Sequence, residues 1–438
     1  GFASSRLRKG LGSMGLMLEA GVRVSNMFVD RKQSGGISHF LVAEPRVNAT
    51  LNLLDSRNNP VFDLLALTGG FGISNKMPTL MYLYPDYAYF DNASLSKYGT
   101  ETKDRLGLIT TDVVKNTANP DLRPARSTKW EAGLSFRINR IKGFATFFHE
   151  FHRHELGFTS QLIWQNYDKY TVPATATDPV FDAASGDVTY RVDGTEHTAL
   201  RTKTTEMYTW SRAANSTTTH KHGIEYGLDF GEIKPLHTSL NISGAWFHIK
   251  RKNENMPLNY INSSFDYVGV LPSGGGNLRD RFNSTFRLIT HIPAIKMVFT
   301  TSVQVVWYES TQTIYEDENG NSRYYLKSYE DKDYLVVDPV GYYDKQGHYT
   351  VWSPADADDA DKSRIMYRTQ PYLYEKDVIK PWALLSFRFT KEIGRVAELS
   401  VIANNFTNTK KWHTNPHSLA KTQLYPDMYF GAELKLKL

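Results

Sequence analysis

Hydrophobic and polar residues alternate over the last twelve residues of the chain. Every second residue of a β-strand points to the same face. One face here is apolar and the other mostly polar: Met428, Phe430, Ala432, Leu434, Leu436 and Leu438 against Tyr429, Gly431, Glu433, Lys435 and Lys437. The alternation recurs along the chain, which favours a membrane β-barrel with lipid outside and water inside. A soluble β-sandwich would give the same pattern only with a second sheet over its apolar face.

The same alternation predicts five hairpins with short connections. Their paired strands are 47–53 with 65–71, 130–138 with the strand from 141, 224–230 with 240–246, 282–288 with 297–305, and 383–389 with 399–403. Further strands are expected near 14–28 and 42–55, so the pattern predicts about twelve strands in all.

Much longer polar segments separate these hairpins: 74–126, 157–217, 251–279, 310–379 and 407–426. Loops of such length are uncommon inside a compact soluble domain. Outer-membrane barrels, by contrast, have short periplasmic turns and long extracellular loops. The sequence therefore predicts an all-β fold, a transmembrane antiparallel β-barrel with long extracellular loops and both chain ends on the turn side.

Composition narrows the class of protein further. Aromatic residues make up 13% of the chain and include 26 Tyr, which suits strands with interfacial girdles. The chain has no Cys, which excludes disulfides, thiolate metal sites and cysteine nucleophiles. A net charge of +5 gives no case for nucleic acid. No apolar run approaches the roughly 20 residues of a membrane-spanning helix. The start at Gly1, without an initiator Met or signal peptide, indicates a processed end or a fragment.

One segment resembles a known family. Residues 119–134 resemble the "NPDL-P-ST-E-GL" segment of TonB-dependent outer-membrane transporters, in which an extracellular loop enters a barrel strand. The matching residues are Asn119, Pro120, Asp121, Leu122, Pro124, Glu131 and Gly133. Residues 70–79 are similar to the family's strand-to-loop passage, and residues 403–408 to its "NLFN" strand end. Within that family these segments are similar to the SusC/RagA-like branch of the Bacteroidota.

The resemblance implies a 22-stranded barrel of which residues 1–438 are the C-terminal portion. The plug domain, the N-terminal strands and the TonB box lie outside this chain. It also implies active transport across the bacterial outer membrane of a nutrient ligand of the glycan, peptide, siderophore or haem class, energised through TonB. The implied partners are the plug and N-terminal strands, the TonB complex acting through the plug, outer-membrane lipid and lipopolysaccharide, and a SusD-like surface lipoprotein. No cofactor or nucleic acid is expected.

Other function classes remain open from the residues alone. One is a passive porin, and another is a non-transporting surface receptor or adhesion barrel. We do not expect an enzyme, because no Ser, His and Asp grouping has a recognisable spacing, although catalytic triads converge in space rather than in sequence.

Aromatic residues in the long loops are candidate ligand contacts, because flat rings beside hydrogen-bonding groups stack on sugars and aromatic chelators. The candidates are Tyr82, Tyr84, Tyr87, Tyr89, Trp164, Tyr167, Tyr324, Tyr325 and Trp352. The alternative, favoured for any single ring, is that these side chains anchor at the membrane interface or pack the loops on one another.

Two segments contain metal-ligand chemistry. The period of a strand puts Glu150, His152 and His154 on one face, where they are able to share a cation. A polar strand end leaving the membrane explains the same residues and is favoured. The acidic segment 356–361 has carboxylates suited to Ca²⁺ but lacks the Gly turn and distal Glu of an EF-hand. A solvated loop tip is the favoured interpretation there.

Overall fold

The fold is all-β, as the alternation predicts. The computed structural model describes residues 1–57, 59–330 and 332–436. Asn58, in the connection of the first predicted hairpin, and the terminal Lys437 and Leu438 lie outside the described residues. The α-helix of these residues is the short α1 (Leu80–Leu83). No helix in the described ranges has both the length and the apolar character needed to cross a membrane.

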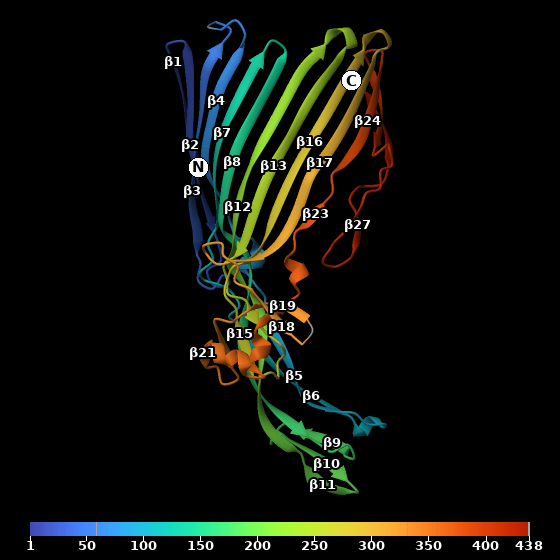
Figure 1. Ribbon diagram of the computed structural model, residues 1–438. Coiled ribbons are helices and arrows are strands. Elements are labelled where there is room, and N and C mark those ends of the chain that lie inside the picture. Colours follow the sequence, from blue (N-terminus) through green and yellow to red (C-terminus); the bar gives the residue numbers. More distant parts are fainter. Residues whose placement is uncertain (58, 331, 437–438) are drawn as a thin grey trace.

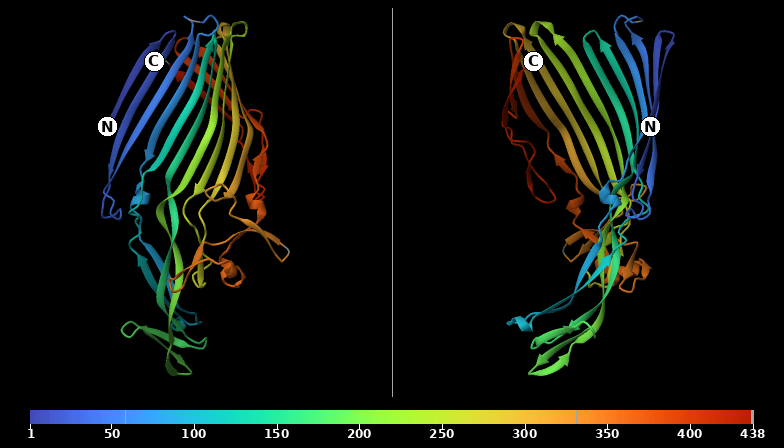
Figure 2. Two further views of the ribbon diagram at one scale, coloured as in Figure 1. Left: turned by 60° about the vertical axis from the view of Figure 1, so that its left-hand side comes forward. Right: turned by 180° about the vertical axis from the view of Figure 1, so that it is seen from behind.

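One antiparallel sheet forms most of the molecule (Figure 1). Its strands follow one another in sequence order: β1 (Phe2–Leu11), β2 (Met14–Phe28), β3 (His39–Asp55), β4 (Leu64–Lys76), β7 (Ala125–Ile138), β8 (Ile141–Thr171), β12 (Leu200–Ile233), β13 (Thr238–Asn253), β16 (Gly275–Ile292), β17 (Met297–Tyr315), β24 (Trp382–Ile393), β25 (Ala397–Asn404) and β28 (Tyr429–Leu436). The short β23 (Asp377–Ile379) pairs with the far end of β17. The C-terminal strands pass behind the N-terminal ones in one view, so the sheet is strongly curved (Figure 2).

All five predicted hairpins are confirmed, as β3–β4, β7–β8, β12–β13, β16–β17 and β24–β25. Their connections gather at one end of the sheet (Figure 1). Two contain a 3₁₀ turn, η2 (Lys234–Leu236) or η3 (Pro293–Ile295), followed by a residue with positive φ. The long connections gather at the other end, so the predicted division into a turn end and a loop end is confirmed.

The N-terminal strand was missed by the sequence pattern. β1 has basic residues on both of its faces, including Arg6, Arg8 and Lys9, so its alternation is weak. Among the described residues it brings the continuous strand order to thirteen, one more than the predicted twelve, and β23 makes the sheet fourteen-stranded. The expectation that both chain ends lie on the turn side is therefore half wrong. β28 ends at the turn end, but Gly1 lies partway along the sheet, beside Val24 (Val24 N to Gly1 O, 2.8 Å).

The long segments carry more secondary structure than predicted. Segment 157–217 was expected to be a loop, but β8 and β12 continue through most of it as a two-stranded ribbon that extends well beyond the main sheet (Figure 1). Its polar, Thr-rich sequence forms strands without an apolar stripe. The remaining loop elements are β5 (Ala88–Lys97), β6 (Leu106–Val114), β9 (Thr177–Asp182), β10 (Asp187–Val192), β11 (Thr195–Thr198), β14 (Leu258–Asn259), β15 (Tyr267–Val270), β18 (Tyr325–Tyr329), β19 (Lys332–Val337), β20 (Gly341–Asp344), β21 (Tyr349–Val351), β22 (Tyr367–Thr369), β26 (Trp412–Thr414), β27 (Lys421–Gln423), η1 (Thr102–Asp104), η4 (Pro354–Asp358), η5 (Lys362–Ile365) and η6 (Pro371–Tyr374).

The two faces of the main sheet differ in chemistry. In β7, Trp130 and Leu134 are 44% and 42% exposed and belong to what we term the apolar face. Lys129, Glu131 and Gly133 alternate with them on the polar face. The register carries both faces across the sheet, since Leu67 pairs with Leu134 and Phe71 with Trp130. An apolar face this exposed, on a sheet whose far face is polar, is the arrangement of a membrane barrel wall.

The C-terminal strand follows the predicted alternation. Phe430, Ala432 and Leu434 pair with Ala403, Val401 and Leu399 and extend the apolar face. Glu433 lies on the polar face and accepts a hydrogen bond from Arg388 (2.7 Å). Both edges of the sheet are open, because β1 and β28 each pair on one side only among the described strands.

Candidate functional site

The polar face carries a pocket at its loop end, which we term the mouth pocket. Its volume is about 530 Å³. Strands β4, β7, β8 and β13 and the loop after β4 supply its lining: Ser74, Asn75, Lys76, Tyr82, Ala125, Arg126, Ser127, Lys129, Glu150, His152, Glu155, Leu156 and Arg251. The pocket therefore joins one predicted aromatic contact to two of the predicted metal ligands.

Glu150 is the centre of an ionic network at this pocket. Its carboxylate lies 3.7 Å from the Lys129 ammonium, 3.5 Å from that of Lys221 and 3.4 Å from His152 Nε2. Lys129 also lies 3.1 Å from Glu131. These residues come from three neighbouring strands, because Lys129, Glu150 and Lys221 pair directly across β7, β8 and β12. The register of the wall thus builds the network.

An aromatic ring lies against the two lysines of this network. The ring of Phe148 is buried, and the ammonium groups of Lys129 and Lys221 lie 5.6 and 5.1 Å from its centroid. The neighbouring Gly223 makes room for the ring, since a Cβ at this position would lie 3.0 Å from Phe148 Cζ and 2.2 Å from the Trp246 carbonyl oxygen. The ring of Phe148 thus positions the two ammonium groups beside Glu150 through cation–π contacts.

The mouth pocket has an excess of positive charge. Four of its lining residues are Lys or Arg and two are Glu. Lys129 is held by Glu131 and Glu150, whereas Lys76 and Arg251 have no carboxylate within ion-pair distance in the described part of the chain. Unpaired cations at the rim of a concave site attract anionic groups such as carboxylate, phosphate or sulfate. The sequence analysis did not identify Lys129 and Arg251 as site residues, although the strand period puts Lys129 and Glu131 on the same polar face.

The segment that carries the family resemblance lies beside this pocket and is anchored to the β8–β12 ribbon. The Asn119 amide donates to the Ala213 carbonyl (2.8 Å), and its Oδ1 accepts from the backbone N–H of Asp121 (3.0 Å). Leu122 is buried in a cluster with Phe40, Leu83 and Ala213. Glu131 and Gly133 lie further along, inside β7 on the polar face. Asn119 and Leu122 thus fix the path by which the loop enters β7, with Pro120 and Asp121 at its surface and Pro124 at the start of the strand.

The predicted aromatic contacts are spread over several loops. Tyr82 lines the mouth pocket and packs on Phe158 (ring centroids 5.3 Å apart). Tyr87 and Tyr89 are exposed, with their ring centroids 6.5 Å apart. Tyr84 accepts a hydrogen bond from the backbone N–H of Asp30 (2.9 Å) and holds two loops together.

The other predicted rings pack within the distal loops. Trp164 donates to the Asp344 carbonyl (2.9 Å), Tyr324 packs against Tyr374 (4.9 Å), and Trp352 lies edge-on to Tyr342 (6.4 Å). Tyr167 is buried in the ribbon. Tyr325 donates to Asp338 (2.9 Å), and burial together with this carboxylate raises its pKa. The structure brings none of these five rings to the mouth pocket, and a ligand role for the nine candidates stays a prediction.

The structure does not bring the three predicted metal ligands together on one face. Glu150 and His152 are neighbours on the polar face, but the strand period breaks at His154, which has φ +55° beside a register shift between β8 and β12. Across the described ranges, no group of three or more His, Cys, Asp or Glu side chains is placed to hold a metal ion. The alternative of a polar strand end accounts for these residues.

The acidic segment 356–361 is not simply a solvated loop tip. Asp356 is buried, caps η4 through the Ser353 backbone N–H (2.8 Å) and accepts from the Lys362 ammonium (2.7 Å). The Lys362 ammonium and the Ser353 N–H hold the pKa of Asp356 below its usual range. Asp356 is therefore neutralised by a lysine of the same loop, Lys362.

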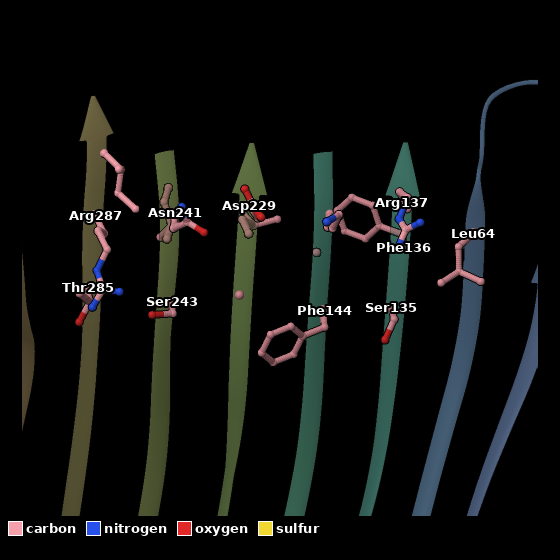
Figure 3. Close-up of a pocket in the computed structure, with 16 residues that line it drawn as sticks. Leu64, Ser135, Phe136, Arg137, Phe144, Asp229, Asn241, Ser243, Thr285 and Arg287 are labelled. Carbon is pink, nitrogen blue, oxygen red and sulfur yellow. The ribbon is translucent and has the colours of Figure 1, made fainter. Parts of the chain in front are cut away.

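A second hollow lies on the polar face near the turn end, and we term it the turn-end hollow (Figure 3). Its volume is also about 530 Å³. Phe144 extends from β8 toward β12, where Gly227 has no side chain to block it (a Cβ would lie 2.5 Å from the ring). Arg137, Asp229 and Arg287 supply charge around this ring. Aromatic and Arg side chains, such as Phe144, Arg137 and Arg287 in this hollow, are enriched at protein contact surfaces.

Comparisons with known proteins give a likeness at the level of structure. No protein-family model matches the chain, and no curated protein matches it. Among solved structures the chain is similar to one described as "Copper transporter OprC", with 9% sequence identity over 99% of this chain and 78% of that chain, and a TM-score of 0.19. At this TM-score the likeness carries no argument. The fold class therefore rests on the strands themselves: all-β, with one large, open antiparallel sheet.

Proposed function

We propose that the chain forms part of the wall and the extracellular loops of a TonB-dependent outer-membrane transporter, which takes up a nutrient ligand by active transport. The observation that carries the proposal is the main sheet, with an exposed apolar face, a charged polar face, short turns at one end and long folded loops at the other. The apolar face would meet lipid, and the polar face would line the lumen. The anchored segment 119–134 adds the family resemblance to this architecture.

The open edges require partners under this proposal. Unpaired backbone groups on an edge strand are costly within a bilayer, so a membrane sheet closes on itself. We propose that further strands of a longer protein pair with β1 and β28 and complete a barrel of 22 strands. The turn-end hollow would then face the lumen on the periplasmic side, where its exposed Phe144 and charged rim suit contact with a plug domain.

The mouth pocket is the proposed ligand subsite. Its unpaired Lys76 and Arg251 suit an anionic group, and Tyr82 offers a ring beside them. The proposed ligand is therefore a member of the glycan, peptide, siderophore or haem class that carries carboxylate, phosphate or sulfate. The exposed Tyr87 and Tyr89 lie in the same loop region as Tyr82 and would contact either the ligand or a SusD-like surface lipoprotein. The SusC/RagA-like assignment is part of this proposal.

Two measurements on the native protein, purified from outer membrane, test the proposal. Peptide mapping by mass spectrometry should recover sequence upstream of Gly1 that encodes a plug and additional strands. In planar bilayers the protein should be electrically silent, and it should bind the periplasmic domain of TonB. A protein that starts at Gly1, conducts ions steadily and does not bind TonB would instead be a passive porin.

A further inference from the structure

Three histidines form a continuous row across the apolar face. His149, His222 and His248 are direct cross-strand partners on β8, β12 and β13. Their ring centroids are 6.3 Å apart between His149 and His222 and 5.1 Å apart between His222 and His248. Trp130 stacks on His149 at one end (5.8 Å), and Asp280 accepts from His248 Nδ1 at the other (2.8 Å). Imidazoles are uncommon on a face otherwise built from aliphatic and aromatic side chains.

The row marks the point at which the apolar face changes its chemistry. The cross-strand row toward the turn end is apolar and contains Phe147, Ile224 and Trp246. The row toward the loop end contains Phe151, His220 and Lys250, and Arg153 lies beyond it. In a membrane barrel an aromatic girdle followed by cationic residues lies at the level of the lipid headgroups.

The charged groups around these histidines do not all cancel, and an excess of positive charge remains near His220. The groups that face His220 are His149, Lys250, Arg153 and Lys252, and those that face His222 are His248, His149 and Asp280. Glu316 neutralises Lys250 (2.5 Å), and Asp280 is occupied by His248 and lies 3.8 Å from Lys376.

Arg153 is the uncompensated charge of this group. Its guanidinium lies over the ring of Phe151 (4.4 Å), and no carboxylate of the described residues is within ion-pair distance of it. His220 stacks on the same Phe151 ring (ring centroids 4.2 Å apart) and is exposed. An arginine and three titratable imidazoles therefore share one accessible patch, made of His149, His220, His222 and Arg153, which we term the histidine patch.

We propose that the histidine patch binds the phosphate group of an outer-leaflet lipid, and binds it more tightly as the pH falls. The inference rests on the proposed function, which puts the apolar face against lipid. Arg153 supplies a permanent charge for the phosphate oxygens, and Trp130 and Trp246 supply the aromatic surface for the adjoining glycerol and acyl chains. Protonation of the imidazoles adds positive charge to the patch as the pH falls. Each added charge near a phosphate strengthens the association about fivefold.

The test uses the full-length native protein in lipid nanodiscs. Native mass spectrometry counts the lipids that remain bound after release from discs of phosphatidylglycerol or of phosphatidylcholine, at pH 8.0 and at pH 5.5. The phosphatidylglycerol phosphate keeps one negative charge at both values, so only the protein titrates. We expect the retained ratio of phosphatidylglycerol to phosphatidylcholine to rise at least fivefold at the lower pH.

Variants separate the patch from general electrostatics. The triple variant His149→Gln, His220→Gln, His222→Gln should lose the pH-dependent rise, and Arg153→Gln should lower retention equally at both pH values. His348→Gln is the matched control, because that histidine lies exposed in a loop and pairs with Asp344. Equal pH responses of the triple variant and the unmodified protein would overturn the inference. If the triple variant fails to assemble, Arg153→Gln alone decides, since unchanged retention in it also overturns the inference.

Flotation of the unmodified protein with phosphatidylcholine vesicles distinguishes this inference from the proposed function. A protein that floats but shows no preference for phosphatidylglycerol contradicts the lipid site alone. A protein that does not float contradicts the membrane placement and the lipid site together.

Discussion

Asn215 and Arg123 hold one another through two hydrogen bonds of 2.9 Å, from the Arg123 backbone N–H to Asn215 Oδ1 and from Asn215 Nδ2 to the Arg123 carbonyl. The same Nδ2 donates to the His154 carbonyl (2.6 Å), beside the left-handed turn of β8. One amide thus ties the segment that enters β7 to the point where β8 and β12 leave the main sheet. The Asn215 amide thus positions the segment that carries the family resemblance, next to the mouth pocket.

Removal of this amide should free the segment. Asn215→Ala leaves the Arg123 N–H and two carbonyls without their partner, which should destabilise the local structure by about 1–3 kcal/mol. We expect faster hydrogen exchange of the backbone amides in residues 119–124. Asn166→Ala is the control, since that exposed side chain bonds only to Thr205 in the same ribbon. Equal exchange in the two variants would contradict the anchoring role.

The glycine under Phe148 should be needed for the network at the mouth pocket. In Gly223→Ala the new methyl group would meet the Trp246 carbonyl and Phe148, and overpacking of this kind typically destabilises a protein by about 1–3 kcal/mol. Gly69→Ala is the matched control, because its Cβ would meet one backbone oxygen at 3.8 Å. Heat-modifiability on gels should report a lower transition for Gly223→Ala. Identical transitions for both variants would argue against close packing at Phe148.

Charge at the mouth pocket should determine which ligands bind. Arg251→Gln removes a cation that has no carboxylate partner among the described residues, so affinity for an anionic probe should fall about five- to tenfold. The probe is a sulfated oligosaccharide, with its desulfated form as the reference, in equilibrium binding to the native protein. Arg57→Gln, at the turn end beside Asp55, should change neither affinity. An equal loss for both forms of the sugar would contradict an anion subsite.

The loop around η4 should unfold locally in acid. The pKa of Asp356 lies below its usual range of about 4 because Lys362 and the Ser353 N–H favour the carboxylate. A group with a lowered folded pKa stabilises the structure fully above its unfolded pKa and loses this contribution as the pH falls through the folded value. Protection of the amides in residues 353–366, relative to their intrinsic exchange rates, should therefore fall below about pH 4. In Asp356→Asn this protection should be low already at pH 7 and should not change further in acid.

The sequence predicted the wall far better than the loops. Alternation sets which residues of a strand share a face, so the paired strands around Leu134, Phe286 and Val401 follow from local pattern alone. β1 was not predicted because Arg8 and Lys9 interrupt its alternation of apolar and polar residues. The ribbon of β8 and β12 was not predicted because it has no apolar face to bury.

The site was predicted only in part, for a related reason. Period 2 puts His154 beside His152, but a left-handed residue at a bulge is a tertiary feature that no periodicity reveals. The mouth pocket joins residues from four strands and a loop, and only the register between strands shows that Arg251 and Tyr82 line the same space. Asn119 was noticed through family resemblance, whereas its neighbour Asn215 had no signal in the sequence.

The environment of each face of the main sheet is directly measurable, because the chain has no native Cys. Single Cys substitutions at the consecutive positions Lys129 to Leu134 would be labelled in intact outer membranes with a water-soluble maleimide. We predict that Cys at 129, 131 and 133 is labelled, and that Cys at 130, 132 and 134 reacts only after detergent is added. Labelling without alternation, or with the opposite alternation, would contradict a membrane wall with its apolar face in lipid.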